Sequence, residues 1–303
     1  MFVDKTHLKK SWFCYIMYLQ KYFIKENLLF VSVSEEIFNV NSPFKSEIVC
    51  FEPVAELVKA GVISEREISA CKNTLDFFDL VTTVTVRIMM NHMENGVRFL
   101  SFDGIVISPF AKIGKGTTIH PGTQIRRNVT IGENCVIGPN SVVDDSVIGD
   151  GCEVNATQVY SSVFEKNVKI GPFCHVRPNS RLCEGVKVGD FVEVKNSVVG
   201  KDTHASHLTY IGDSDVGERV NFGCGTVCVN YNGYVKNRCV IGDDAFIGCN
   251  TNLVAPVTIG DGGYTAAGST ITDDVPSGAL AIARARQVNK LDWATEQKKK
   301  YKK

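Results

Sequence analysis

The sequence lacks an excess of either charge, an apolar run long enough to cross a bilayer, and cysteines spaced as metal ligands. It contains 33 Lys and Arg residues against 33 Asp and Glu residues, and this balance argues against a dedicated nucleic-acid binder. The apolar run at 12–19 is too short to span a bilayer, and no small-residue cleavage site of a signal peptide follows it. We expect no transmembrane segment, and we interpret 11–25 as an amphipathic helix that packs on the protein or on a partner, or contacts a membrane surface.

None of the eleven cysteines forms a C-x-x-C pair, and their spacings are long and irregular. An odd number without short loop spacings argues against a disulfide framework, and the missing pairs argue against a zinc site. Several cysteines take the place of a small apolar residue. The pattern favours a reduced, cytoplasmic protein.

Glycine is missing from the first 60 residues, because the first glycine in the chain is Gly61. A glycine-rich phosphate loop is therefore absent from this stretch. The mixed pattern predicts a small α/β or α+β segment of unknown role over 1–77. Within it we expect helices at 11–25, 53–60 and 64–77 and strands at 28–33 and 48–51. The next stretch, 78–104, is predicted to be a helix that ends at Gly96 as its C-terminal cap, followed by a linker.

From Ile107 onward, aliphatic residues recur every six positions. They are Ile107, Ile113, Ile119, Ile125, Ile131, Ile137 and Val143, then Ile170, Val176, Leu182, Val188 and Val194, then Ile241, Ile247, Leu253, Ile259, Thr265 and Ile271. Glycine commonly follows the aliphatic residue. Neither a helix nor a hairpin produces such a period, whereas a solenoid of short parallel strands does. The period therefore predicts a mainly β solenoid over 105–275, and a β-sandwich would show alternation and hairpin turns instead.

The six-residue period slips near 143–148, near 154–170, and between Val199 and Ile241. The last slip lies within 190–240, where polar residues gather, so we expect the site in this stretch. After Ile271, a turn rich in Asp, Pro and Gly is predicted to stop the solenoid. Residues 276–303 form a C-terminal arm with a basic tail, which we expect to be solvated and disordered.

Five sequence motifs carry a more specific resemblance. They are RPNSRLCEGVKVGDFVEVKNSVVG, HLTYIGD, VNFGCGTVCVNYNG, IGDDAFIGCNTNLVAPVTIGDG and AAGSTITDDVPSGALAIARARQVNK. Together they resemble the C-terminal half of the bifunctional bacterial enzymes that acetylate glucosamine-1-phosphate and then uridylylate the product. The resemblance covers residues 80–293 and includes the helix text RIMMNHMENGV. It implies a left-handed parallel β-helix of triangular section, as in other hexapeptide-repeat acyltransferases.

The N-terminal stretch does not resemble that family's uridylyltransferase domain, which is much larger and opens with a glycine-rich nucleotide loop. We therefore expect uridylyl transfer to be absent. The resemblance implies an acetyl-CoA-dependent N-acetyltransferase that makes N-acetylglucosamine-1-phosphate for UDP-N-acetylglucosamine and cell-wall (peptidoglycan) synthesis. It also implies a cytoplasmic homotrimer. Residues 1–77 would cap the first coil or bind a partner, such as a separate uridylyltransferase.

The resemblance assigns the general base to His207, in the motif HLTY. A histidine with a pKa near neutrality suits removal of a proton from the amine. Arg177, Lys195, Tyr210 and Asn221 match the positions that bind the sugar phosphate. Without the resemblance, the two cations would be ordinary surface charges. Glu193 lies on the same expected strand face as Lys195 and is a candidate to orient a cation.

The positions that bind acetyl-CoA in the family correspond here to Cys224, Asn230, Tyr231, Cys249, Ala267 and Arg284. Lys236 is a further candidate from the same polar loop. Two positions depart from the family: the usual NYDG reads NYNG, with Asn232, and the usual serine at 249 is a cysteine. Acetylation implies no metal, and His120, His175, His204 and His207 lack the motifs of the three-histidine solenoid carbonic anhydrases.

Two other functions stay open at this point. The enzyme could acetylate another amino sugar or a nucleotide sugar, although Arg177, Lys195 and Tyr210 argue against a large change of substrate. The chain could instead be a non-catalytic scaffold or regulator that kept the solenoid. The joint presence of His207, Asn230 and Arg284 argues against that, because a scaffold needs none of them.

Overall fold

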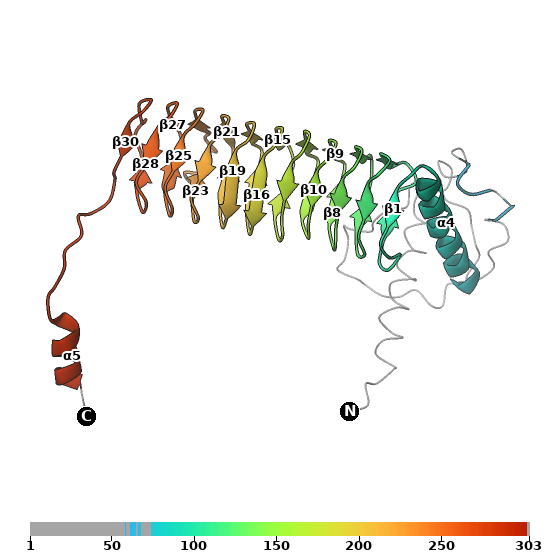
Figure 1. Ribbon diagram of the computed structural model, residues 1–303, viewed down its shortest axis with the longest axis horizontal. Helices are drawn as coiled ribbons and strands as arrows, with labels where there is room; N and C mark the ends of the chain where they lie inside the picture. The colour runs from blue at the N-terminus through green and yellow to red at the C-terminus, as the bar shows by residue number, and fades with distance from the viewer. Residues whose placement is uncertain (1–57, 59–60, 65, 68–73, 302–303) are drawn as a thin grey trace.

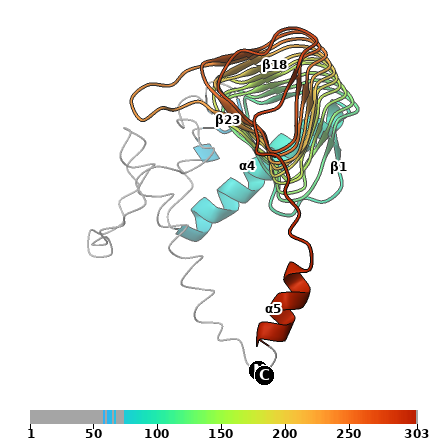
Figure 2. The same cartoon turned by 90° about the vertical axis from the view of Figure 1, so that its left-hand side faces the viewer.

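The computed structural model describes residues 58, 61–64, 66–67 and 74–301. The helix expected at 11–25, the strands at 28–33 and 48–51, and most of the helices at 53–60 and 64–77 lie outside the described residues. The described chain is a long rod of stacked coils with one helix at its N-terminal end (Figure 1). Viewed along its axis, the rod has a triangular section (Figure 2). The left-handed sense of the coil stays a prediction.

Helix α4 (Thr74–Glu94) leads into the rod, and its end agrees with the sequence. Gly96 has a φ of 86°. Its N–H donates to the carbonyl of Met93 at 2.9 Å, and the Val97 N–H donates to that of His92 at 3.0 Å. These two bonds form a Schellman cap, which needs a residue free to adopt a left-handed conformation. The prediction that the helix ends at Gly96 is confirmed.

Three parallel sheets form the three faces of the rod, and each strand pairs with the strand three places along the chain. Sheet A contains β1 (Arg98–Phe99), β4 (Thr118–Ile119), β7 (Val136–Ile137), β10 (Glu153–Val154), β13 (Lys169–Ile170), β16 (Lys187–Asp190), β19 (His204–His207), β22 (Asn221–Phe222), β25 (Phe246–Ile247), β28 (Tyr264–Thr265) and β30 (Leu280–Ala281). Sheet B contains β2 (Val106–Ile107), β5 (Gln124–Ile125), β8 (Val142–Asp144), β11 (Gln158–Tyr160), β14 (His175–Val176), β17 (Glu193–Lys195), β20 (Tyr210–Gly212), β23 (Val227–Val229), β26 (Asn252–Val254) and β29 (Thr270–Ile271). Sheet C contains β3 (Lys112–Ile113), β6 (Thr130–Ile131), β9 (Val147–Ile148), β12 (Val163–Phe164), β15 (Arg181–Leu182), β18 (Val198–Val199), β21 (Ser214–Val216), β24 (Cys239–Ile241) and β27 (Val257–Ile259).

The core is a set of columns of aliphatic residues that point into the rod. Ile119, Ile137, Leu182, Ile247 and Leu253 have no exposed surface. The other residues of the six-residue series are buried as well, apart from Ile113, which packs against the core from its edge. Strand neighbours alternate between the core and the solvent, as a pleated strand requires. The hexapeptide period thus predicted the mainly β solenoid correctly.

The sequence misplaced the third slip of the period. Between Val199 and Ile241 the core columns continue through Ala205, Ile211, Val216, Phe222 and Cys228, which are all buried and pair in register. The period shortens by one residue between Ile211 and Val216, and the one insertion lies between Cys228 and Ile241, which are thirteen positions apart instead of six. We call residues 230–238 the insertion loop. It projects from the rod after β23 (Figure 2).

The C-terminal boundary also differs from the prediction. The turn at 273–278 does not stop the solenoid, because Val275 is buried and bridges Ile259, and β30 pairs with β28. An extended segment then leads to α5 (Trp293–Tyr301), a helix without buried residues that contains most of the basic tail. The tail is solvated, as expected, but helical up to Tyr301.

Strand β6 offers a test of the core, because Ile131 points inward and Thr130 points outward. Ile131→Ala removes a side chain that is 2% exposed and should lower the free energy of unfolding by about 2–5 kcal/mol. Thr130→Ala, on the exposed side of the same strand, should change it by less than about 1 kcal/mol. Urea unfolding measures both, and equal losses would contradict the assigned facing of the strand.

Candidate active site

Several predicted site residues lie in one line along the rod. They occupy the turns between sheet A and sheet B, which we call the A/B corner. The strand register aligns Asp190 with His207. Continuing it past β19, β22, β25 and β28 aligns His207 with Cys224, Cys249 and Ala267. Parallel strands are about 4.8 Å apart, so the line from His207 to Ala267 is roughly 14 Å long.

Arg284 lies one coil beyond Ala267. Strand β30 pairs with β28, and the Thr270 N–H donates to the carbonyl of Ala283 at 3.2 Å. The exposed Arg284 side chain passes beside Gly268. The A/B corner therefore presents an ordered series of side chains, with an imidazole at one end and a guanidinium about four coils, or roughly 19 Å, away. An extended ligand with an anionic end fits such a series.

His207 has a carboxylate partner that the sequence did not reveal. Its Nδ1 lies 3.1 Å from Oδ1 of Asp190, and both side chains are exposed, by 58% and 43%. A carboxylate that accepts a hydrogen bond from Nδ1–H leaves Nε2 with its lone pair free. This pair can therefore accept a proton at Nε2 and stabilise the resulting imidazolium. The gap of one coil, seventeen positions, is the signal in the sequence that could have pointed to Asp190.

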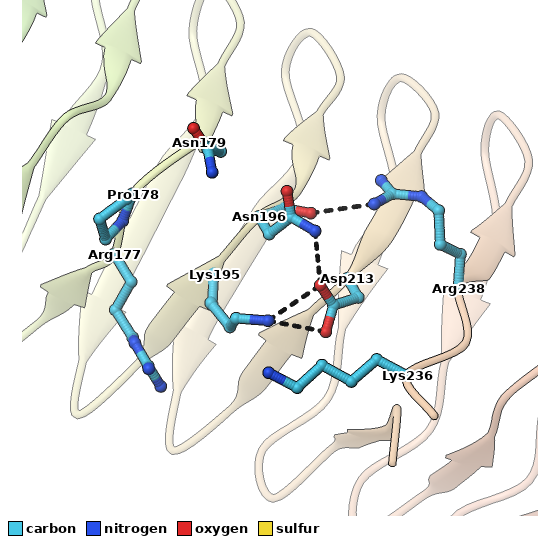
Figure 3. A pocket seen from close by; sticks show the side chains of 8 residues that line it. All are labelled: Arg177, Pro178, Asn179, Lys195, Asn196, Asp213, Lys236 and Arg238. Atoms are coloured by element: carbon cyan, nitrogen blue, oxygen red, sulfur yellow. Dashed lines mark hydrogen bonds and ion pairs between the residues drawn. The ribbon is translucent and has the colours of Figure 1, made fainter. Parts of the chain in front are cut away.

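The outer face of sheet B carries a second group of polar residues, around a buried carboxylate (Figure 3). Both oxygens of Asp213 accept hydrogen bonds from Nζ of Lys195 at 2.9 Å. Asp213 also accepts from Nδ2 of Asn196 at 2.5 Å and from Nδ2 of Asn230. Nδ2 of Asn230 also donates a hydrogen bond to Oη of Tyr210 at 3.2 Å. Asp213 thus connects Lys195 and, through Asn230, Tyr210. The sequence had assigned Lys195 and Tyr210 to the sugar phosphate and Asn230 to acetyl-CoA.

The electrostatics of this group follow from its burial and its partners. Burial raises the pKa of Asp213, but hydrogen bonds from Asn196, Lys195 and Asn230 outweigh it, so the pKa lies below the usual range. Burial lowers the pKa of Lys195, but its bonds to Asp213 outweigh this and raise it. The Lys195 ammonium in turn lowers the pKa of Lys236, because the two like charges lie close together.

These residues line a pocket of about 530 Å³. Its wall contains four cations, Arg177, Lys195, Lys236 and Arg238, against one carboxylate, Asp213. Figure 3 shows the Arg177, Lys195 and Lys236 side chains lying along the same side of the pocket. Outside this lining, Glu193 accepts from Nη1 of Arg177 at 2.9 Å, as the sequence suggested. Asp215 likewise pairs with Arg238, so the four cations meet three carboxylates, and the remaining excess of one positive charge makes the pocket suited to an anion.

The insertion loop covers one side of this pocket. Its ends are held by an antiparallel bridge between Tyr231 and Lys236, and Oη of Tyr231 donates to the carbonyl of Gly233 at 2.6 Å. Oδ1 of Asn232 accepts the N–H groups of Tyr234 and Val235, at 3.0 and 2.9 Å. The asparagine in NYNG therefore forms the turn that an aspartate could form, since both side chains offer the same acceptor.

The structure separates the predicted residues into two groups. Arg177, Lys195, Tyr210, Asn230 and Lys236 lie in or beside the pocket. His207, Cys224, Cys249, Ala267 and Arg284 lie on the A/B corner, and Asn221 lies on the outer face of sheet A beside His204. Tyr210 starts the strand that follows the His207 turn and so joins the two groups. The sequence missed Asp213, because Gly-Asp recurs in many coils as a turn signal.

Residues 58, 61–64, 66–67 and 74–301 contain no cluster of three or more His, Cys, Asp and Glu side chains that could bind a metal ion. Neither α4 nor any other helix among them is long and apolar enough to cross a membrane.

Comparisons with known proteins agree with the solenoid fold. Residues 110–145 and 238–273 match the family described as bacterial transferase hexapeptide (six repeats), and 138–229 match the GlmU-like, C-terminal hexapeptide family. The bifunctional protein GlmU of Caldicellulosiruptor saccharolyticus is 50% identical over 246 residues, which cover 81% of this chain and 53% of that protein. GlmU of Clostridium perfringens is 55% identical over 214 residues, 71% of this chain and 47% of that protein.

The chain thus spans about half the length of the curated relatives it matches. Residues 80–303 cannot hold an alignment of 246 residues, so the similarity begins before residue 80, earlier than the sequence motifs indicated. Among solved structures, a UDP-N-acetylglucosamine O-acyltransferase from Moraxella catarrhalis is 16% identical, covering 65% of this chain and 77% of that chain, with a TM-score of 0.34. A similarity that low carries no argument about the site.

The buried acid generates a prediction about stability and pH. Asp213→Asn keeps the size of the side chain but leaves Lys195 without its counter-charge, so the free energy of unfolding at pH 7 should fall by about 2 kcal/mol. Because the folded-state pKa of Asp213 is lowered, its stabilisation is present above the unfolded pKa of about 3.9 and is lost as pH falls through the folded pKa. The difference between the two proteins should therefore shrink below about pH 4.

Urea unfolding from pH 3 to pH 7 measures this difference. Asp215→Asn is the matched control, because Asp215 also pairs with a cation, Arg238, but its side chain is 51% exposed. It should cost less than about 1 kcal/mol. Equal losses from the two variants would contradict the central role of Asp213.

Proposed function

Because the chain belongs to the hexapeptide-repeat acyltransferases and is related to the C-terminal half of GlmU, we propose that it transfers an acetyl group from acetyl-CoA to the amine of glucosamine-1-phosphate. The product would be N-acetylglucosamine-1-phosphate, a precursor of UDP-N-acetylglucosamine and of cell-wall polymers. The observation that carries the proposal is the His207–Asp190 pair at the A/B corner, three residues from Tyr210 at the cationic pocket. In this proposal the base and the line for an extended donor lie at the A/B corner, and the anion site lies on the outer face of the adjoining sheet B.

His207 is the general base of the proposed reaction. Its Nε2 takes a proton from the substrate nitrogen as that nitrogen attacks the carbonyl carbon of the thioester. The bond from the carbonyl carbon to sulfur then breaks, and the sulfur leaves with the electron pair as the thiolate of CoA. Asp190 keeps the proton on Nδ1 and stabilises the imidazolium that forms. Backbone N–H groups near Cys224 are the candidates to stabilise the developing oxyanion.

The pocket on sheet B is proposed to hold the sugar phosphate. Arg177 offers a planar guanidinium for bidentate contact with phosphate oxygens, and Lys195 and Lys236 add compact charges. Tyr210, beside the pocket, is assigned to a sugar hydroxyl, whereas Asn221, on the outer face of sheet A, would have to contact the sugar from a second subunit. Lys195 is already held in place by Asp213, so little side-chain freedom is lost when an anion binds.

The line of side chains along the A/B corner is proposed to hold acetyl-CoA, with its thioester beside His207. Cys224, Cys249 and Ala267 would contact the extended arm, and Arg284 a phosphate group at its far end. Asn230 and Tyr231 would contact the donor from the insertion loop. The residues fit this role because the line is roughly 19 Å long and ends in an exposed guanidinium.

A homotrimer is part of the same proposal, and an exposed apolar ridge supports it. Phe173, Phe191 and Leu208 occupy matching turns of the A/B corner and are 62%, 56% and 57% exposed. The two phenylalanine rings stack at 5.5 Å. All three residues have positive φ angles, of 59°, 58° and 43°, which cost each bulky side chain about 1 kcal/mol. A second copy of the chain that covers the ridge would lie beside His207, so the donor groove would form between subunits.

The enzyme is proposed to work in the cytoplasm. The eight described cysteines are all free, including Cys224 and Cys249 on the A/B corner. Free thiols at this density suit a reducing compartment.

Release of CoA from acetyl-CoA in the presence of glucosamine-1-phosphate tests the proposed reaction, with the protein's own thiols subtracted as background. His207→Ala should lower kcat by roughly a hundredfold or more, because it removes the group that takes the proton. The matched control is His204→Ala, three residues earlier on the same strand, which should leave kcat within about twofold. An active protein whose kcat is unchanged by His207→Ala would overturn the proposed base.

Sedimentation tests the proposed trimer. The intact chain of 33.3 kDa should sediment at about three times that mass, whereas Phe191→Asp should give monomers and lose most acetyl transfer, because a charge on the ridge opposes its burial. The control is Val147→Asp, at an apolar position on sheet C that is 45% exposed, which should stay trimeric. A trimeric Phe191→Asp variant would exclude the ridge as the interface.

A further inference from the structure

Two thiols lie next to each other on the A/B corner. Cys224 is the first residue of the two-residue turn after β22, and Cys249 is the first residue of the same kind of turn after β25. The second residue of each turn has a positive φ, 77° at Gly225 and 53° at Asn250. The two turns therefore have the same conformation, and the strand register places one cysteine directly above the other.

The two turns also touch through their backbones. The Asn250 N–H donates to the carbonyl of Cys224 at 2.8 Å. A Cβ atom added to Gly223 would lie 2.5 Å from the backbone nitrogen of Cys249. Adjacent parallel strands put matched Cα atoms about 4.8 Å apart, inside the range of about 4.4–6.8 Å that a disulfide requires. Gly223 and Gly225 flank Cys224, whereas Cys249 lies between Gly248 and Asn250.

Among the described cysteines, this pair combines proximity with access. Cys249 is exposed and Cys224 is half-buried. Cys135, Cys152 and Cys174 are buried inside turns of the core, where burial raises the pKa of each thiol, that of Cys152 to about 12. Cys228 and Cys239 are neighbours, but neither has any exposed surface. An oxidant in solution therefore reaches the corner pair first.

We propose that Cys224 and Cys249 form a reversible disulfide when the protein meets a small-molecule disulfide, and that this bond closes the acyl-donor groove. The Cys249 thiolate attacks one sulfur of the small disulfide, forms a mixed disulfide and releases one small thiol. The Cys224 thiolate then attacks the Cys249 sulfur and releases the second small thiol. Two protein thiols are oxidised and one small disulfide is reduced to two thiols, so electrons and protons balance.

The effect on activity rests on the proposed function, whereas the bond itself does not. Both sulfurs lie in the line between His207 and Ala267, which is the proposed path of the donor arm. Drawing the two side chains together would remove the surface that the arm contacts and would hold the two turns at a new spacing. Oxidised protein should therefore lose acetyl transfer, and a reducing thiol should restore it.

Incubation of the full chain with glutathione disulfide tests the proposal, followed by digestion without reduction and mass spectrometry. A peptide pair linked between Cys224 and Cys249 is expected, and dithiothreitol should release it. Wild-type acetyl transfer should fall at least tenfold on oxidation and recover with dithiothreitol. Cys183→Ser removes another half-buried thiol and should behave like wild type. The residual activity of Cys249→Ser should not fall on oxidation.

The peptide link and the acetyl-transfer rate together distinguish failure of the disulfide, of the groove closure and of the proposed function. Glutathione adducts at Cys249 without the Cys224–Cys249 link would overturn the disulfide. A link that forms in full while acetyl transfer continues unchanged would overturn the closing of the groove. A link that forms in a protein without any acetyl transfer before oxidation would confirm the disulfide and contradict the proposed function.

Discussion

The structure depends on the stacking of coils at the spacing of paired β-strands. No single coil can bury its aliphatic residues, because each coil has only two to four residues per strand and no second layer of its own. Ile137 is covered by Ile119 on one side and by Val154 on the other, and every core column repeats this arrangement. The repeat fixes the register of all three faces. Because the register is fixed, each turn residue lies one strand spacing from the matching turn residue of the next coil, and this holds for any residue type.

The candidate site uses this regularity in two ways. On the A/B corner, residues far apart in the sequence become neighbours at a constant spacing, so the base and Arg284 stand at opposite ends of one line. On sheet B, the site instead depends on a departure from the repeat. A buried carboxylate, Asp213, stands where many coils have a solvated turn, and it joins the solenoid wall to the insertion loop through Asn230. The stacked coils therefore place the side chains of the A/B corner, and the buried carboxylate of Asp213 positions the insertion loop.

The sequence predicted those parts of the molecule that are periodic. Ile119, Leu182 and Ile247 were placed correctly because an aliphatic residue every six positions has few structural explanations. The region from Val199 to Cys228 was misjudged because Ala205, Phe222 and Cys228 occupy core positions without being aliphatic and branched. The period shortens only once there, to five positions between Ile211 and Val216, and the residue types concealed the rest.

The site was predicted less completely, for a different physical reason. His207 and Arg177 were recognised through motifs, and their proposed roles stay predictions. Asp190 and Asp213 were missed because an aspartate after glycine is a common turn residue, and its sequence neighbours do not say whether it is solvated. Burial of Asp213 follows from the insertion loop, which covers it. That arrangement is a property of the folded chain and has no local signature.

The insertion loop leaves the core unchanged, although it adds seven positions to one coil. Cys228 and Cys239, at its two ends, are both fully buried, and the strands on either side of it keep their pairing with the coils above and below. Beyond Asn230, which bonds to Asp213, residues 231–238 of the loop are exposed or half-buried, so the core does not constrain their side chains. The length and the side chains of this part of the loop can therefore change without altering the coils on either side of it.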